Sequence, residues 1–215
     1  MDIEAPHGPI ETWKDFFIHL CIITLGLLIA LGLEGTVAHF HERSLVKEAR
    51  ANIRTEVVDN QKSIEASMKA TSQEKENMQN LLDYLELMKK NPAAHGSAEI
   101  NFHMTNLNRA SWNTAAATGA FGFMPYRDVK RYEDIYDSQN EFLLSQQQAM
   151  NDWAGVYGAF LQLMRQDQKA KPTDAGTAQI NAVEEKTQTY IGRLMGVESS
   201  AESLDQQYTN FLKSN

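Results

Sequence analysis

The first pattern along the chain is an unbroken apolar run at residues 16–33, FFIHLCIITLGLLIALGL, without a formally charged side chain. Its eighteen residues would extend about 27 Å as an α-helix, close to the hydrocarbon thickness of a bilayer. A core helix would keep a polar stripe and an interfacial helix a charged face, but this run is apolar all round apart from His19 and Thr24. The pattern therefore predicts a single membrane-spanning helix.

A cleaved signal peptide is a further alternative for this segment. Signal peptides carry a basic stretch before a shorter apolar run. Here Lys14 is outnumbered by acidic residues before the run, and Thr36-Val37-Ala38 is only a passable cleavage site. We therefore divide the chain into a short acidic tail at residues 1–15, a transmembrane helix with its interface at 16–38, and a helical extramembrane domain at 39–215.

Small residues within the span form two small-xxx-small pairs, along which a neighbouring helix could approach closely. These candidates for membrane helix packing are Gly26 with Ala30, and Gly32 with Thr36.

Two ionisable residues, His19 and Glu34, are candidate intramembrane polar contacts. Both lie near an end of the span, so they could reach water as interfacial anchors or pair with a cation of a partner protein. The only cysteine, Cys21, lies in the same run, where a small hydrophobic role is favoured over a reactive thiol. An internal disulfide is excluded.

The flanking cations set the expected orientation. Only Lys14 and the terminal amine precede the span, whereas Arg43, Lys47, Arg50 and Arg54 follow it. This asymmetry predicts that the C-terminal domain lies in the cytoplasm, with the N-terminus outside. Because the cations begin about ten residues beyond the span and long domains can translocate regardless of charge, a periplasmic domain stays open.

The rest of the chain has a helical period. Neither glycine nor proline occurs from Thr36 to Asn91, and an apolar seam there follows one helix face. A polar run at residues 71–77, TSQEKEN, predicts a bend or a solvent-crossing stretch before the helix ends at Asn91-Pro92. The seam consists of Val46, Ala49, Ile53, Val57, Asn60, Ile64, Met68 and Thr71.

Three further helices are expected at about residues 106–118, at 126–168, and after the turn at 171–174. Gln139 and Gln146 interrupt the apolar seam of the second of these, where they could specify register or mark a face that meets solvent. Period-two alternation is limited to Ile100, Phe102 and Met104. The predicted fold class is all-α, with one N-terminal transmembrane helix continuing into an elongated antiparallel helical bundle.

The corner between the short helix and the next one contains the most specific local pattern. Gly119 supplies a permissive backbone turn after an alanine-rich helix, and Trp112, Tyr132 and Tyr136 could pack around it. We expect a helix-corner packing motif here, and the same four residues are the candidate partner or ligand surface.

Composition and motifs narrow the function classes. The chain has 28 Asp and Glu against 20 Lys and Arg, a net charge of -8, so nucleic acid is not an expected partner. The phosphate-loop, dinucleotide-binding, nucleophile-elbow and haem-attachment motifs are absent from the sequence. His39 and His41 are two positions apart and would point to different sides of a helix. We expect no cofactor, no metal site and no enzymatic activity.

Two segments together resemble a group of uncharacterised bacterial single-span inner-membrane proteins. The first is GLLIALGLEG at residues 26–35 with the HER and EARANIRTEVVDN sequences after it, and the second is the W-x-x-A-x-x-TGA-x-x-x-M sequence from residue 112 with the Y-x-x-x-Y pair from residue 132. The resemblance implies an integral inner-membrane protein with a helical extramembrane domain, and it assigns no activity to single residues. Some relatives have a basic N-terminus, so their orientation does not carry over to this acidic one.

Three function hypotheses follow. The first is a non-enzymatic, membrane-anchored interaction or scaffolding subunit, with membrane lipid and either other membrane protein subunits or further copies of the chain as partners. The second is a sensor-like helical bundle that binds a ligand and signals through a partner, because the short tail across the bilayer leaves no room for an output domain. The third is an enzyme of unrecognised class.

Overall fold

The computed structural model describes residues 13–91, 96, 98–167 and 174–214. These residues form α1 (Trp13–Lys90), α2 (Ala110–Ala117), the short 3-10 helix η1 (Ala120–Phe123), α3 (Tyr126–Asp167) and α4 (Asp174–Lys213). No strand occurs among the described residues. The predicted all-α fold, in which an apolar N-terminal helix continues directly into a helical bundle, is confirmed.

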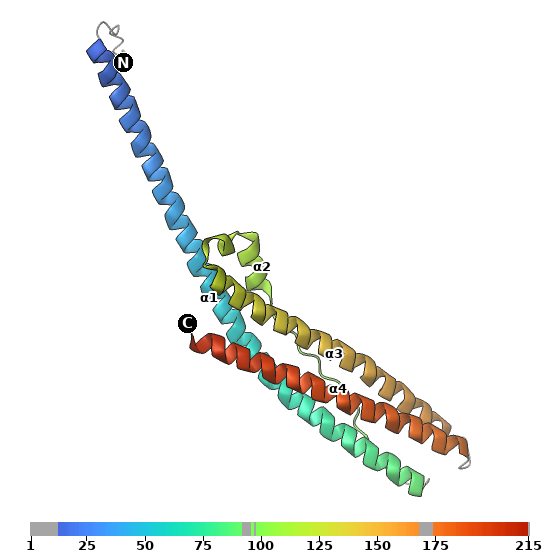
Figure 1. Ribbon diagram of the computed structural model, residues 1–215. Helices are drawn as coiled ribbons and strands as arrows, with labels where there is room; N and C mark the ends of the chain where they lie inside the picture. Colours follow the sequence, from blue (N-terminus) through green and yellow to red (C-terminus); the bar gives the residue numbers. More distant parts are fainter. Residues whose placement is uncertain (1–12, 92–95, 97, 168–173, 215) are drawn as a thin grey trace, which may run out of the picture.

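The first half of α1 stands out from the body as a single helix, and its second half joins the bundle (Figure 1). There α4 packs against both α1 and α3, and it runs antiparallel to them (Figure 1). The short elements α2 and η1 pack against α1 at the end of the body from which the first half of α1 emerges, and the C-terminus lies near that end (Figure 1). We call residues 13–41 of α1 the stem.

The apolar seams predicted for the long helices form the core. On α1 the seam residues Ile53, Val57 and Ile64 have no exposed surface, and on α4 Leu194 and Leu204 are equally buried. Each such side chain removed from water contributes about 1.5–3 kcal/mol to the fold. This periodic burial, rather than intrinsic helix propensity, holds the three long helices together.

The expectation of a bend or a solvent-crossing stretch at residues 71–77 is wrong in its second form, since α1 stays helical there and three of these seven polar side chains face the body. Thr71, Glu74 and Asn77 are all buried. Buried polar side chains need hydrogen-bond partners, so the interior beside α1 must contain more than apolar helix surface.

For Glu74 one partner is the N–H of His103, which belongs to an extended segment, residues 98–109, that we call the strap. It lies along the bundle and joins α1 to α3 through hydrogen bonds. The short helix expected from residue 106 begins only at Ala110, because the backbone N–H and C=O of Asn108 bind a side chain of α1 instead of other backbone groups of a helix. The side-chain amide of Asn60 accepts from Asn108 N and donates to Asn108 O, both at 2.8 Å.

The same pairing recurs on the α3 side. The amide of Gln146 accepts from Thr105 N at 2.8 Å and donates to Thr105 O at 3.3 Å. Gln139 Nε2 donates to Asn108 O at 3.2 Å. An extended chain without a neighbouring strand leaves its N–H and C=O groups unpaired, and these helix side chains take the place of a β-ladder. Gln139 and Gln146 thus interrupt the seam to bind backbone, not to face solvent.

Candidate functional site

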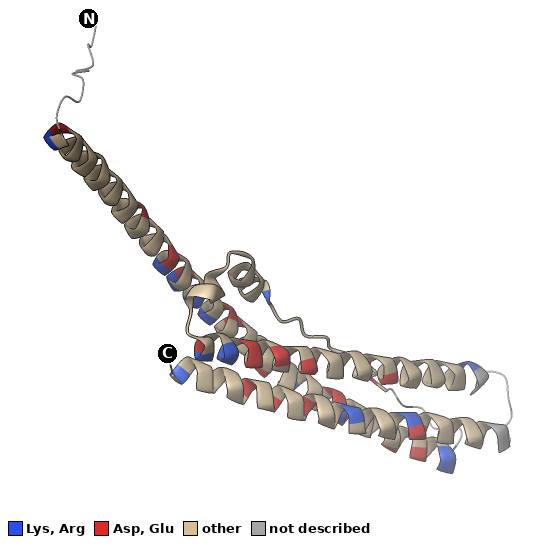
Figure 2. Ribbon diagram, turned by 45° about the horizontal axis from the view of Figure 1, so that its top comes forward, with Lys and Arg blue, Asp and Glu red and all other residues tan. Residues whose placement is uncertain are grey.

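The stem is the most distinctive surface of the molecule. Every residue from Phe16 to His41 is exposed, and the apolar window within α1 has a mean hydropathy of 2.6 with none of it buried against the body. Figure 2 shows that Lys, Arg, Asp and Glu are sparse along it. One helix of this chain is therefore long and apolar enough to cross a membrane, and it lies near the N-terminus.

Polar groups within the stem are bound by the helix itself. Thr24 Oγ1 donates to Leu20 O at 2.8 Å, and Thr36 Oγ1 donates to Gly32 O at 2.7 Å. His19 Nδ1 donates to Asp15 O at 2.8 Å. Because a hydroxyl without a partner is costly in hydrocarbon, these backbone contacts make both threonines compatible with a lipid environment.

The candidate contact residues of the span all lie on the exposed surface of the stem. Gly26 and Gly32 have open space around them, and Ala30, Thr36, His19 and Glu34 are exposed. No other part of the described chain covers them. Helix packing through the two small-residue pairs, and polar contacts through His19 and Glu34, stay predictions about a partner helix.

The predicted aromatic corner is present where α2, η1 and α3 meet. The ring of Trp112 lies 4.6 Å from Phe121 and 5.2 Å from Tyr136, measured between centroids. Tyr132 in turn packs edge-on against Phe211 of α4, at 5.6 Å. Gly119, just after α2, has a φ of 74°, the left-handed conformation expected of a residue that ends a helix.

This geometry limits what the corner can offer a partner. Tyr132 is 4% exposed and Tyr136 1% exposed, so both rings belong to the core of this chain. Trp112 is half-buried, and Gly119 is exposed. A partner surface at this corner stays a prediction, but it could use only Gly119 and the outer part of Trp112 among the four candidate residues. Sequence reasoning missed two more exposed side chains at this corner, Phe123 and Tyr126.

Two buried glutamates form a repeated arrangement that pattern reasoning did not reveal. Glu56 accepts from Tyr136 OH at 2.6 Å and from Ser111 N at 2.8 Å. Glu74 accepts from Tyr190 OH at 3.0 Å and also from the N–H of His103 in the strap. Each carboxylate therefore joins α1, another helix and the segment that follows α1.

Burial is the largest influence on the pKa values of Glu74, Tyr136 and Tyr190. It raises the pKa of Glu74, against the opposing effect of the His103 N–H and the Tyr190 hydroxyl. Burial and the neighbouring carboxylate both raise the pKa of Tyr136 and of Tyr190, so these phenols stay protonated and donate. Because the two glutamates are buried and their oxygens are occupied, Glu74 fixes the strap, Glu56 fixes the start of α2, and a substrate has no access to either carboxylate.

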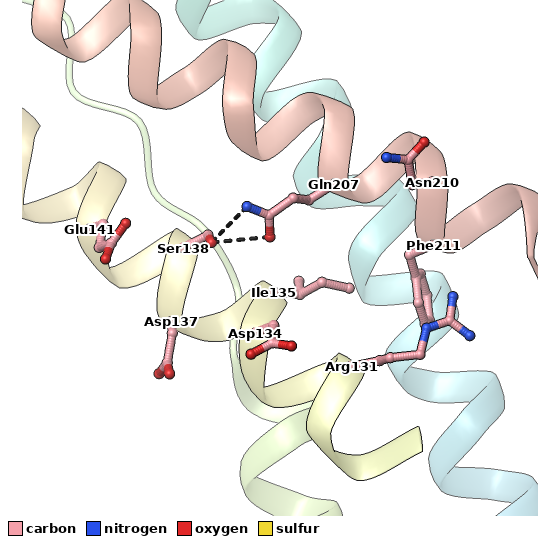
Figure 3. Close-up of a pocket in the computed structure, with 9 residues that line it drawn as sticks. All are labelled: Arg131, Asp134, Ile135, Asp137, Ser138, Glu141, Gln207, Asn210 and Phe211. Atoms are coloured by element: carbon pink, nitrogen blue, oxygen red, sulfur yellow. Dashed lines mark hydrogen bonds between the residues drawn. The ribbon is translucent and has the colours of Figure 1, made fainter. Parts of the chain in front are cut away.

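A surface depression of about 520 Å³ lies between α3 and α4 (Figure 3). Its lining combines Arg131 with the carboxylates of Asp134, Asp137 and Glu141. The hydroxyl of Ser138 is paired with the Gln207 amide, at 2.9 and 3.0 Å, rather than with a base (Figure 3). The depression is therefore a polar surface feature in which the serine is not arranged as a nucleophile.

Among the described residues, no group of three or more His, Cys, Asp or Glu side chains is placed to hold a metal ion. His39 and His41 are both exposed on α1. Comparisons of the chain with protein-family models, with curated proteins and with solved structures found no match.

Proposed function

We propose that this chain is a non-enzymatic, single-span membrane protein whose helical body serves as an interaction or scaffolding subunit of a larger membrane complex or of a homo-oligomer. The proposed location is the bacterial inner membrane, with the body in the cytoplasm, as the flanking cations favour. The proposed partners are membrane lipid and other protein subunits, which include further copies of the chain.

One observation carries the proposal: the fully exposed apolar stem and the core seam of the bundle belong to the same unbroken helix, α1 (Figure 1). An apolar surface of this length is not stable in water and needs lipid or another protein around it. The buried carboxylates of the body, Glu56 and Glu74, are occupied by backbone N–H groups and tyrosine hydroxyls, which supports a structural role for them.

Site-specific photo-crosslinking in native membranes tests the proposal. A photoreactive amino acid is placed at Leu28 of the stem or at Leu144 of α3, both of which are exposed. We expect crosslinked species of discrete mass, identified by mass spectrometry as the chain itself or as a defined membrane protein. The same amino acid at Ile53, which is fully buried, is the matched control and should give no intermolecular product.

Two results would contradict the proposal. The first is a chain that carbonate washing releases from membranes into the supernatant, because the anchor would then be absent. The second is a chain that stays monomeric in mild detergent and gives no crosslinked partner from either exposed position.

A further inference from the structure

The charges of the body are separated along its length. The structure brings together residues 39–54 of α1, residues 109–131 around α2 and η1, and residues 208–214 at the end of α4. Arg50 pairs with Asp128 at 2.6 Å, and Arg54 Nη2 donates to Leu212 O at 3.2 Å. We call this the proximal end, because the stem emerges from it (Figure 1).

The proximal end is basic although the chain as a whole is acidic. Its three segments contain nine Lys and Arg against three Asp and Glu. The remaining segments of the body, residues 55–108 and 132–207, contain ten Lys and Arg against twenty Asp and Glu. Of the nine cations, Arg43, Lys47 and Arg127 are among those exposed. The sequence alone distributes these charges over three distant segments, and only the fold collects them.

The proximal end also lies at the right height to meet a bilayer surface. The predicted transmembrane helix and its interface end at residue 38, and the body first covers α1 at Glu42, Leu45 and Val46. This gap of four to eight residues corresponds to about 6–12 Å along a helix. Arg43, the first cation of the proximal end, therefore lies about 8 Å beyond the interface along the helix, about one Debye length at physiological ionic strength.

Two exposed aromatic side chains stand at the same end. Phe123, the last residue of η1, is 50% exposed, and Tyr126, the first residue of α3, is 81% exposed. Neither ring is needed for the aromatic core of the corner, which is formed by Trp112 and its neighbours. Exposed aromatic rings next to arginine and lysine are typical of surfaces that lie in the membrane interface.

We propose that the proximal end binds the anionic lipid headgroups of the same bilayer that holds the stem, with Arg43, Lys47 and Arg127 on the phosphates and Phe123 and Tyr126 at the interface. The inference rests on the anchoring part of the proposed function, and it adds a lipid class and a second point of attachment. Such a contact restrains the tilt of the body against the membrane. It is also screened by salt, since the Debye length is only about 8 Å at physiological ionic strength.

The experiment uses the full chain reconstituted into vesicles of phosphatidylcholine, with or without phosphatidylserine. Cys21 is the only cysteine, so a Cys21→Ala background accepts one new labelling site. A polarity-sensitive dye at Phe123→Cys should shift to shorter wavelength and be quenched by headgroup-nitroxide lipid in the anionic vesicles. Both effects should be lost in the neutral vesicles and at about 1 M salt, where the Debye length is about 3 Å.

Two matched labels distinguish failure of the headgroup contact from failure of the membrane anchor. Leu87→Cys is at a site of similar exposure, 48%, near the far end of α1, and should show neither effect in any vesicle. Leu28→Cys reports the stem and should be quenched by acyl-chain nitroxide in both kinds of vesicle. A quenched stem label with a Phe123 label that does not distinguish anionic from neutral lipid would overturn the headgroup contact alone. An unquenched stem label would overturn the anchor, and with it both proposals.

A charge variant tests the cause of the contact. Arg43→Glu combined with Lys47→Glu should abolish the response of the Phe123 label to phosphatidylserine. Lys62→Glu combined with Lys69→Glu makes the same change in net charge farther along α1 and should leave the response intact. Equal loss in both double variants would show a dependence on total charge only, and would overturn a local site.

Discussion

The amide pair between Gln146 and the strap offers the sharpest test of how the body is held together. Replacing Gln146 with Met keeps the length and nearly the volume of the side chain but removes both hydrogen-bonding groups. Thr105 N and Thr105 O, which the amide binds at 2.8 and 3.3 Å, would then be buried without that partner. Gln146 itself is only 2% exposed, so water cannot readily take its place.

The expected cost follows from the two groups left behind. A buried backbone donor or acceptor that loses its partner costs about 1–3 kcal/mol. The apolar methionine recovers part of this loss, which leaves a destabilisation of about 2–4 kcal/mol for Gln146→Met. In a body of this size that corresponds to a fall in melting temperature of roughly 4–16 °C.

Gln139 is the matched control, since it is the same residue type on the same helix and is 3% exposed. Its Nε2 donates to Asn108 O, but that oxygen also accepts from Asn60, and Gln139 Oε1 has no hydrogen-bond partner among the described residues. Gln139→Met therefore orphans no strap group and removes an unsatisfied oxygen. We expect a change within about 1 kcal/mol of zero.

Circular dichroism of the full chain in mild detergent gives the melting temperatures of both variants. Hydrogen exchange of the Thr105 amide gives a local readout, which should become much faster in Gln146→Met only. Equal destabilisation by the two substitutions, or unchanged exchange at Thr105, would refute the idea that these amides replace a β-ladder.

Three further predictions concern the corner, the buried carboxyl and the span. Gly119→Ala should destabilise the body by about 1–2 kcal/mol because an L side chain is strained at a φ of 74°, whereas Gly122→Ala, which meets open space at an ordinary φ, should have little effect on melting. Burial raises the pKa of Glu74 above its ordinary 4.5, so the folded state binds more protons than the unfolded one, and the contribution of this group to stability falls as the pH rises from 4.5 through the raised value. Unfolding titrations should therefore show the stability of Glu74→Gln increasing relative to that of the wild type over this pH range. A stability difference that does not change with pH would contradict the prediction. Ile23→Arg with Leu27→Arg should cost about 6–8 kcal/mol of insertion free energy and release the chain on carbonate washing, while alanine at both positions should leave it in the pellet.

The long helices were predictable because their burial is periodic. The seam from Val46 to Thr71 needed only the spacing of side chains along one element, and the left-handed Gly119 followed from its place after an alanine-rich helix. Such local signals survive in a single sequence because the same residues that form a helix also form its buried face.

The strap was not predictable in the same way. Its only pattern was the alternation of Ile100, Phe102 and Met104, and it has no neighbouring strand to complete it. Its partners, among them Asn60 and Gln146, lie 48 and 41 residues away along the chain from the groups they bind. A single sequence does not distinguish a buried glutamine from an exposed one, so the hydrogen bonds between these side chains and the strap could be found only from the tertiary structure.

The exposure of the candidate contact residues of the stem could be expected from sequence, because the run that contains them is apolar all round. The basic proximal end could not be expected in this way, because it is assembled from three segments separated by acidic ones. Sequence reasoning chose Tyr132 and Tyr136 as candidate surface residues of the corner, but both are buried in the core. It did not identify Phe123 and Tyr126, which are exposed.

Because α1 is one continuous helix, a change in the tilt of the stem moves the far end of the body with it. From Phe40 to Lys90 the helix extends about 75 Å, so a tilt of about 20°, ordinary for a membrane helix, swings its far tip sideways by about 25 Å. Tilt responds to the thickness of the surrounding lipid. A change of a few ångströms in bilayer thickness would thus produce a much larger lateral displacement of any protein bound at the far end of α1.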